Sequence, residues 1–164
     1  MITTQHKKHL IQETIAYLEQ ELEQASNALA STKSYSQSSD LKQEGKYDTR
    51  AIEAGYLAGA QKKRVEELRR DLAIMSNLDE KVLVKNDSIS VFSVVELKDE
   101  TDNISYYFLC STPAPSSFQI NGLKICSVTL ESPFGQALIN LKTDDDFSLE
   151  IGPEEREYLV KSIF

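Results

Sequence analysis

Apolar residues recur at alternating intervals of four and three along most of the first half of this 164-residue chain. The first run comprises Ile11, Ile15, Leu18, Leu22, Ala25 and Leu29. The second run comprises Tyr47, Ala51, Ala54, Ala58, Gln61, Val65, Leu68, Leu72 and Met75. This spacing is typical of the heptad seam of a coiled coil, in which one stripe of each helix faces its partner. The two runs therefore predict an antiparallel α-helical coiled-coil hairpin at the start of the chain.

The segment between the two runs lacks apolar periodicity. Hydroxyl and amide side chains fill residues 31–39 and compete for backbone hydrogen bonds, so the first helix is predicted to fray or end there. We predict a finger over residues 1–76 with its tip between Ser34 and Lys46. Gly55 and Gly59 each cost a helix up to about 1 kcal/mol relative to alanine. Close approach of the two helices is the expected reason for them.

The second half of the chain changes to a strand-like pattern. β-Branched and aromatic residues cluster or alternate in VLV, SISVFSVVEL, ISYYFLCST, LKICSVTL, DFSLEI and EREYLVKSIF. In SPFGQAL, Ser132 can cap a short helix that has Pro133 in its first turn. The predicted fold class is α+β, with a coiled-coil finger over residues 1–78 and a small β-rich domain of mixed sheet over residues 79–164.

Charge and hydropathy exclude several classes of protein. The net charge of -8 argues against a general nucleic-acid binder, which needs a basic surface to displace phosphate counterions. No apolar run approaches the roughly 20 residues that span a bilayer, and the opening MITTQHKKHLIQET lacks the apolar core of a signal peptide. We therefore expect a cytoplasmic protein that does not enter a membrane.

Few residues suggest an autonomous active site. Cys110 and Cys126 lack metal-ligand spacing and are expected to be reduced, buried thiols. The acidic run at residues 144–146 lies in a predicted turn, and His6 and His9 have no acidic or cysteine partner nearby that would complete a zinc site. There is no glycine-rich phosphate loop. We expect neither an enzyme nor a cofactor of the chain's own.

Two motifs carry a resemblance to a known family. DLKQEGKYDTRAIEAGY, residues 40–56, is similar to the tip of the bacterial Gre-type (GreA/GreB) transcript cleavage factors, with roughly D-L-[KR]-E-N-x-E-Y and a later G-[FY]. SPFGQAL, residues 132–138, resembles that family's S-P-[IL]-[GA]-x-[AG]-L motif in its FKBP-like C-terminal domain. The resemblance covers nearly the whole chain and implies an FKBP-like fold for the second half.

The resemblance implies a transcription elongation factor, accessory to RNA polymerase, whose finger enters the secondary channel of the polymerase. Asp40 and Glu44 would help hold a second Mg²⁺ of the polymerase active centre, so that the polymerase cuts its own backtracked RNA. Lys42, Lys46 and Arg50 would contact the polymerase or the 3′ end of the nascent RNA. Docking on the rim is assigned to a surface formed by Ser132, Pro133, Phe134, Gly135 and Gln136. The chain is expected to act as a monomer.

The tip departs from the family's pattern at one position. Asp40 falls on the first tip acid, but Gln43 occupies the second, and Glu44 follows one residue later. Gln43 lacks the charge that favours Mg²⁺. A non-cleaving regulator in the same channel is therefore the alternative function, and an interaction module related to nucleoside diphosphate kinase regulators is a further one. For Phe134, burial in the core is the alternative to a docking role. For the tip acids, the alternative is a solvated turn.

Overall fold

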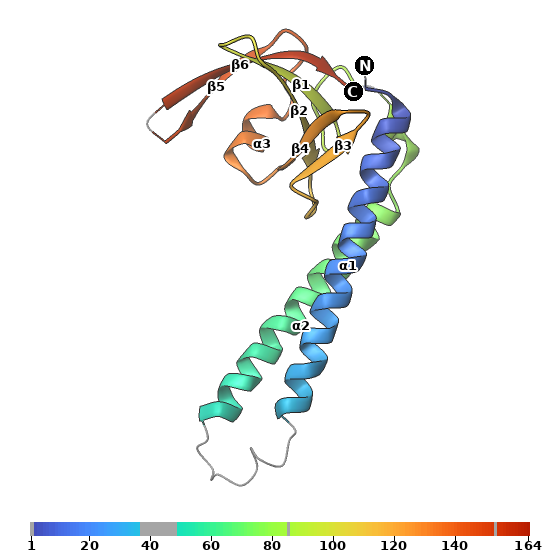
Figure 1. Cartoon of the computed structure of the whole chain (residues 1–164), viewed down its shortest axis with the longest axis vertical. Helices are drawn as coiled ribbons and strands as arrows, with labels where there is room; N and C mark the ends of the chain where they lie inside the picture. Colours follow the sequence, from blue (N-terminus) through green and yellow to red (C-terminus); the bar gives the residue numbers. More distant parts are fainter. Residues whose placement is uncertain (1, 37–48, 85, 153) are drawn as a thin grey trace. The chain divides into compact units, whose positions relative to one another are not determined.

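The described part of the chain falls into two units. The computed structural model describes residues 2–36, 49–84, 86–152 and 154–164, and Figure 1 shows the order of the elements. Contacts group Met1–Thr14 with Asn77–Phe164 in one unit and leave Ile15–Ser76 as the other. The boundary predicted after residue 78 thus lies beside the change at residue 76, whereas the first fourteen residues group with the second half.

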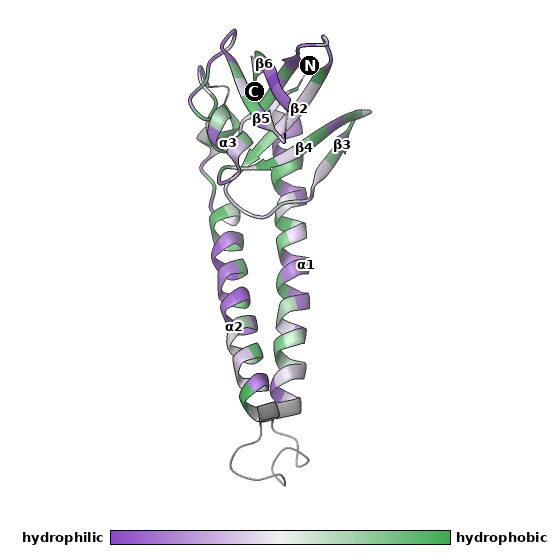
Figure 2. Ribbon diagram, turned by 90° about the vertical axis from the view of Figure 1, so that its left-hand side faces the viewer, coloured by the Kyte–Doolittle hydropathy of each residue, from purple (hydrophilic) through white to green (hydrophobic). Residues whose placement is uncertain are grey.

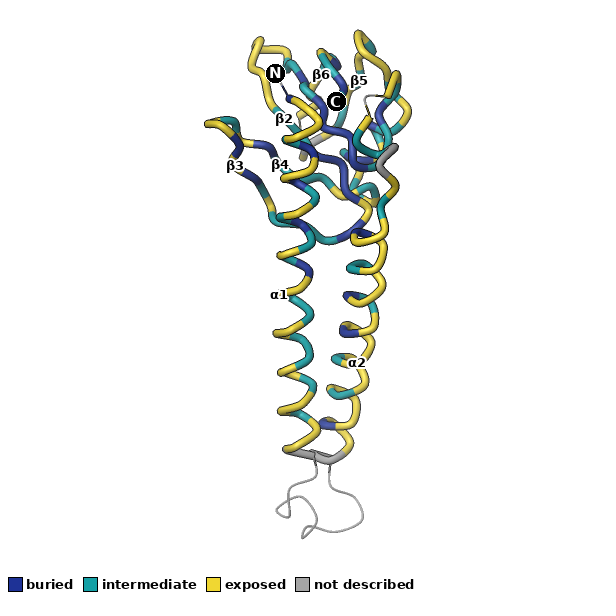
Figure 3. Tube along the Cα trace, turned by 90° about the vertical axis from the view of Figure 1, so that its right-hand side faces the viewer, coloured by how far each residue is buried: buried dark blue, intermediate teal, exposed yellow. Residues whose placement is uncertain are grey.

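Two long helices form the unit Ile15–Ser76, as the heptad spacing predicted. They are α1 (Thr4–Ser36) and α2 (Thr49–Ser76). Every described seam residue of this unit is buried or half-buried, and Leu18 and Leu68 are 0% exposed. The buried stripes of the two helices face each other in Figure 3. The hydrophilic residues, purple in Figure 2, lie mainly on the helix surfaces that face away from the partner helix. An ion pair of 3.6 Å between Glu21 and Arg64 also joins the helices. The predicted antiparallel hairpin is confirmed.

One local expectation for the helices is confirmed and another is wrong. Helix α1 ends at Ser36, within the hydroxyl-rich run of residues 31–39, as predicted. The first part of the run is still helical, because a hydroxyl there can bond within the helix: Ser31 Oγ donates to the Asn27 carbonyl at 3.0 Å. Gly55 and Gly59 are exposed, and a Cβ built on either would meet nothing within 4 Å. Close helix approach therefore does not explain these two glycines.

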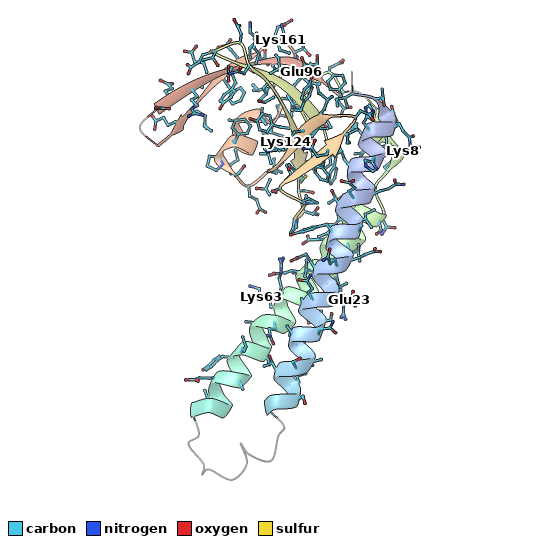
Figure 4. The ribbon with its side chains drawn as sticks, viewed as in Figure 1. Lys8, Glu23, Lys63, Glu96, Lys124 and Lys161 are labelled. Atoms are coloured by element: carbon cyan, nitrogen blue, oxygen red, sulfur yellow. The ribbon has the colours of Figure 1, made fainter. Side chains whose placement is uncertain are left out.

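The outer surface of α2 carries charge pairs along the helix. Lys62 lies 3.8 Å from Glu66, and Lys63 lies 3.8 Å from Glu67, both at the i,i+4 spacing that favours such pairs. Lys63 is labelled in Figure 4. All four side chains are substantially solvated. The basic run KKRVEELRR, residues 62–70, is therefore a charged helix face with its own counter-charges rather than a continuous basic patch.

The unit formed by Met1–Thr14 and Asn77–Phe164 contains a six-stranded mixed sheet of order β3-β4-β2-β1-β6-β5. Its elements after α1 are η2 (Glu80–Leu83), β1 (Val94–Asp99), β2 (Ile104–Cys110), β3 (Ser117–Ile120), β4 (Leu123–Thr129), α3 (Pro133–Leu138), β5 (Asp146–Ile151) and β6 (Glu154–Ile163). The β2–β4 pair is parallel and the other neighbours are antiparallel. The predicted mixed sheet with one short helix is confirmed.

The strand pattern misjudged two segments. VLV, residues 82–84, falls partly in the 3-10 helix η2, and Ser88 makes only an isolated bridge to Lys142 before the first strand begins at Val94. Strand β3 was not predicted at all. It pairs with β4 through a turn at Asn121 and Gly122, whose φ angles are +50° and +80°. An Asn-Gly pair is a strong sequence signal for such a hairpin.

One apolar cluster joins the sheet to α3. Its buried members are at most 1% exposed and comprise Ile89, Val95, Leu97, Leu109, Leu138, Val160 and Ile163. Leu138 comes from α3, whereas most of the others come from β1, β2 and β6. The short helix therefore has a fixed place against one face of the sheet, which positions the motif that contains it.

A charged side chain is also buried in this unit. Lys7, in the first turns of α1, is 2% exposed, and its Nζ donates to the Val82 carbonyl of η2 at 2.6 Å. Burial disfavours the charged amine and lowers the pKa of Lys7 to about 8, from its usual 10.5. The buried ammonium of Lys7 therefore lowers the free energy of unfolding most below pH 8, and this destabilisation decreases as the pH rises and the amine loses its proton.

We expect the stability of the wild type relative to a Lys7→Met variant to rise between pH 7 and pH 10.5. The unfolded chain binds more protons at Lys7 than the folded chain over this interval, so the free energy of unfolding increases with pH. The lowered pKa corresponds to up to about 3 kcal/mol. Urea denaturation of both proteins measures the difference.

The exposed neighbour provides the control, because Lys8→Met removes the same charge from the same helix without a buried amine. That variant should follow the wild type at every pH. Parallel curves for the wild type and Lys7→Met would contradict the prediction.

Candidate functional site

The residues predicted to act at the tip lie in the segment that joins α1 to α2. Asp40, Lys42, Gln43, Glu44 and Lys46 all fall in residues 37–48, which are outside the described residues. The assignments of catalytic and metal-directed roles to Asp40 and Glu44 therefore stay predictions. Arg50 belongs to the first turn of α2, so the helix fixes the position of its backbone.

The described helices determine where this segment begins and ends. It leaves α1 at Ser36 and enters α2 at Thr49. Helix α2 has 28 residues and therefore places Thr49 about 40 Å from Ser76, at 1.5 Å per residue. The tip motif is thus attached to the end of a helical pair that is stabilised along its seam.

Apolar side chains are exposed on α2 just after the tip motif's acidic part. Tyr56 is 77% exposed, Ile52 56% and Leu57 52%. Tyr56 is a motif residue, whereas Ile52 and Leu57 were not singled out from the sequence. The signal was available, since both are apolar residues that lie off the heptad seam of an otherwise polar helix surface.

The second predicted site begins with the cap of α3. Ser132 has an extended backbone, its Oγ accepts a hydrogen bond from the Gly135 N–H at 3.0 Å, and it donates to the Thr129 carbonyl at 2.7 Å. Pro133 occupies the first turn, where its missing N–H costs nothing. The predicted cap is confirmed, and the two hydrogen bonds fix α3 to the end of β4.

Phe134 packs inside the unit rather than standing free beside Pro133. Its ring is half-buried, and its centroid lies 4.9 Å from that of Tyr107, 5.4 Å from Tyr158 and 5.8 Å from Phe147. Such tilted and edge-on contacts stabilise the fold beyond simple burial. An exposed aromatic–proline pair was expected here, but the structure favours the core alternative for Phe134.

The exposed part of this motif is small. Pro133 and Gln136 are exposed, as is Glu131 just before the cap. Gln136 Nε2 lies 3.4 Å from the Glu131 carbonyl, a long hydrogen bond that leaves the rest of the amide accessible. A partner that docks on α3 would therefore meet an amide, a proline ring and a carboxylate.

Gly135 is the buried member of the motif. A Cβ built on it would lie 2.1 Å from the Thr129 carbonyl oxygen and 2.9 Å from its carbon, both backbone atoms. Real Cβ atoms do not approach other atoms so closely, and a backbone carbonyl cannot rotate away. Glycine at this position therefore allows α3 to pack against the end of β4.

The other candidate residues do not assemble into a metal site. Among the residues that the structure describes, no group of three histidine, cysteine or acidic side chains could hold a metal ion. Asp145 accepts from the Lys142 N–H at 2.7 Å, which makes the acidic run part of a turn as predicted. His9 lies 3.0 Å from Glu13, so the expectation that it has no acidic partner nearby is wrong. His6 Nδ1 accepts from the Thr3 N–H. Cys110 and Cys126 are free thiols as expected, but only Cys110 is buried, whereas Cys126 is half-buried. Burial raises the pKa of Cys110 to about 12.

The described helices carry no sign of a membrane span. Among the helices that the structure describes, none combines the length and the apolar composition that a bilayer-spanning helix needs.

Solved structures of transcription factors resemble the chain. GreA factor homolog 1 (Gfh1) of Thermus thermophilus is 23% identical over 93% of this chain and 95% of its own, with a TM-score of 0.38. Gfh1 of Thermus aquaticus is 25% identical over 93% of this chain and 94% of its own, with a TM-score of 0.39. The elongation factor GreA/GreB of Nitrosomonas europaea is 15% identical over 58% and 78%, with a TM-score of 0.37. No family model and no curated protein matches the chain.

Adding a methyl group at two glycines should have opposite effects. Gly135→Ala forces a Cβ against the Thr129 carbonyl and should lower the free energy of unfolding by about 3 kcal/mol. Gly59→Ala places a Cβ in open space in the middle of α2 and should raise it by up to about 1 kcal/mol. Chemical denaturation followed by circular dichroism measures both. A Gly135→Ala variant as stable as the wild type would contradict the close approach.

Proposed function

We propose that this protein is a transcription elongation factor that binds RNA polymerase, with its helical hairpin in the secondary channel and its tip at the active centre. The observation that carries the proposal is the tip motif, residues 40–56, which begins between two long helices paired along an apolar seam and continues into the second of them. If the tip were only a solvated turn, the length of the helical hairpin would have no functional explanation. An interaction module formed by the second half alone also leaves the hairpin unexplained.

The chemical role proposed for the tip is assistance to a metal in the polymerase. Two-metal hydrolysis of a phosphodiester stabilises both the attacking and the leaving oxygen, and Mg²⁺ takes oxygen ligands while it keeps several waters. A carboxylate brought from outside can complete such a site. Asp40 is assigned this role with Glu44 in support, and Lys42, Lys46 and Arg50 are assigned to the polymerase or the RNA phosphates near its 3′ end.

A second candidate function rests on Gln43. At the second acid position an amide offers an oxygen but no charge, so it attracts Mg²⁺ less strongly than a carboxylate. A protein with this tip would occupy the channel and reshape or block the active centre without promoting cleavage. Both candidates require binding to the polymerase and differ in the chemistry at the tip.

The tip assignment predicts opposite effects for two substitutions. Asp40→Ala should reduce cleavage of backtracked RNA at least tenfold and leave polymerase affinity nearly unchanged, because the lost interaction acts in the transition state. Gln43→Glu should raise cleavage, because it restores a charged oxygen at the second acid position. The measurement is transcript cleavage by stalled, backtracked complexes, with affinity measured in parallel.

Gln24→Glu is a matched control, since it makes the same change at an exposed position on the body of α1. Cleavage by that variant should equal that of the wild type. If the wild type binds without cleavage and Gln43→Glu gains it, the non-cleaving regulator is the better description. If no form binds polymerase, the proposed function is wrong.

The docking role is now assigned to the exposed residues of the α3 motif. The double substitution Pro133→Ser with Gln136→Ala should weaken polymerase binding roughly tenfold if these side chains lie at the centre of an interface. Gln119→Ala, at an exposed position on β3, is the control and should leave affinity unchanged. Circular dichroism must show that the double variant is folded. Unchanged affinity in that folded variant would remove docking from this surface.

A further inference from the structure

Strand β5 forms one edge of the six-stranded sheet, and its outer side is open. All of its residues, Asp146–Ile151, stand opposite residues of β6. Among the residues that the structure describes, no backbone hydrogen bond joins β5 to any element other than β6. The outward N–H and C=O groups of such an edge strand can pair with another extended chain. Neither the tip motif nor the α3 motif contributes a residue to this edge.

The outer part of the β5–β6 pair also lacks a third strand. Strand β1 stands opposite β6 only from Tyr158 to Ile163, so within the described structure residues 154–157 pair with β5 alone. Figure 1 shows β5 and β6 extending beyond the other strands of the sheet. A two-stranded ribbon is marginally stable by itself in water. A further strand on β5 would supply hydrogen bonds and packing that this ribbon lacks.

One face of the ribbon is acidic. Residues that stand opposite each other in an antiparallel pair share a face. This acidic face comprises Asp146, Ser148 and Glu150 of β5 with Glu155 and Glu157 of β6, and all five are exposed. Glu150 stands directly opposite Glu155, an arrangement of like charges that destabilises a strand pair. Ser148 Oγ donates to Glu155 Oε1 at 2.6 Å, but this hydrogen bond brings no positive charge to the face.

Two nearby bases already have acidic partners. Lys98 on β1 borders the acidic face, because it stands opposite Leu159 of β6, and it forms a salt bridge with Asp102. Arg156 lies on the other face of the ribbon and pairs with Glu154 at 3.2 Å. The acidic face would therefore repel a second copy of β5, whereas it complements a strand with basic side chains.

The other face of β5 is apolar. Phe147 and Leu149 alternate with the acidic positions, and both are half-buried. Phe147 stacks on Tyr158 of β6, with ring centroids 5.3 Å apart. Side chains of a strand point alternately to its two faces, so a strand added to β5 would place every second side chain beside these apolar residues. The remaining side chains would lie beside the acidic face. Strand β5 thus favours a partner strand with one apolar and one basic side.

We propose that the outer edge of β5 binds an extended segment of a partner protein in which lysine or arginine alternates with apolar residues. Backbone hydrogen bonds to β5 provide affinity, and the alternating side chains provide specificity. The basic side chains lie beside Glu150 and its acidic neighbours, and the apolar ones cover Phe147 and Leu149. This surface is separate from those assigned to the polymerase, so the proposal stands independently of the proposed function.

The test is calorimetric titration of the full chain with the peptide KVKVKVK, acetylated and amidated at its ends. The block peptide KKKKVVV has the same composition and charge but cannot place its lysines along one side of a strand. We expect saturable binding of the alternating peptide and about tenfold weaker binding of the block peptide. Amide hydrogen exchange measured by NMR should slow at outward-facing amides of β5. Absence of saturable binding at millimolar concentration, equal affinity for both peptides, or unchanged exchange in β5 would each overturn the proposal.

Variants locate the binding on the acidic face. Glu150→Gln combined with Glu155→Gln removes two charges and keeps the shape of both side chains. It should weaken binding of the alternating peptide about fivefold, the size expected for two exposed ion pairs. Glu19→Gln combined with Glu23→Gln makes the same change at exposed positions of α1 and should leave affinity unchanged (Glu23 is labelled in Figure 4). Unchanged affinity in the folded β5–β6 variant, or an equal loss in the α1 variant, would contradict the assignment.

Discussion

A single strip of apolar contact between α1 and α2 holds the helical hairpin together. Leu18, Val65 and Leu68 are at most 4% exposed within it, and full burial of one such side chain contributes about 1.5–3 kcal/mol. The charge pairs on the outer faces contribute far less, because exposed ion pairs are typically worth under about 1 kcal/mol. The seam therefore keeps Ser36 and Thr49 together, and with them the two ends of the segment that contains the tip motif.

The same seam contains one polar residue whose position is informative. Gln61 occupies a heptad position, and its buried Oε1 has no hydrogen-bond partner among the described residues. An unsatisfied buried oxygen costs about 1–3 kcal/mol. Gln61 therefore lowers the stability of the seam at this position, and the apolar residues around it must offset that cost.

The α3 motif combines structural and surface residues within seven positions. Ser132 and Gly135 fix the helix to the end of β4, and Phe134 and Leu138 pack into the unit. Pro133 and Gln136 remain exposed. Five residues of the motif were predicted to form the docking surface. Because Phe134 packs into the unit, only the exposed Pro133 and Gln136 remain as candidates. The sequence motif could not make this distinction, because all of these residues are contiguous and the motif carries no information about which side of a short helix faces the sheet.

Heptad spacing by itself determined the helical hairpin, since a 3.6-residue period has one way to bury a continuous stripe of apolar residues. The cap of α3 was likewise predictable from the sequence, because Ser132 caps the helix through a local hydrogen bond to the Gly135 N–H. Longer-range packing decided the rest. VLV at residues 82–84 has a strand's composition, yet most of it lies in η2, where the Val82 carbonyl accepts from Lys7, seventy-five residues away in the sequence. The parallel pairing of β2 with β4 also joins distant segments. Only the tertiary structure could bring these residues together, because local periodicity reports which side of an element is buried but not what it is buried against.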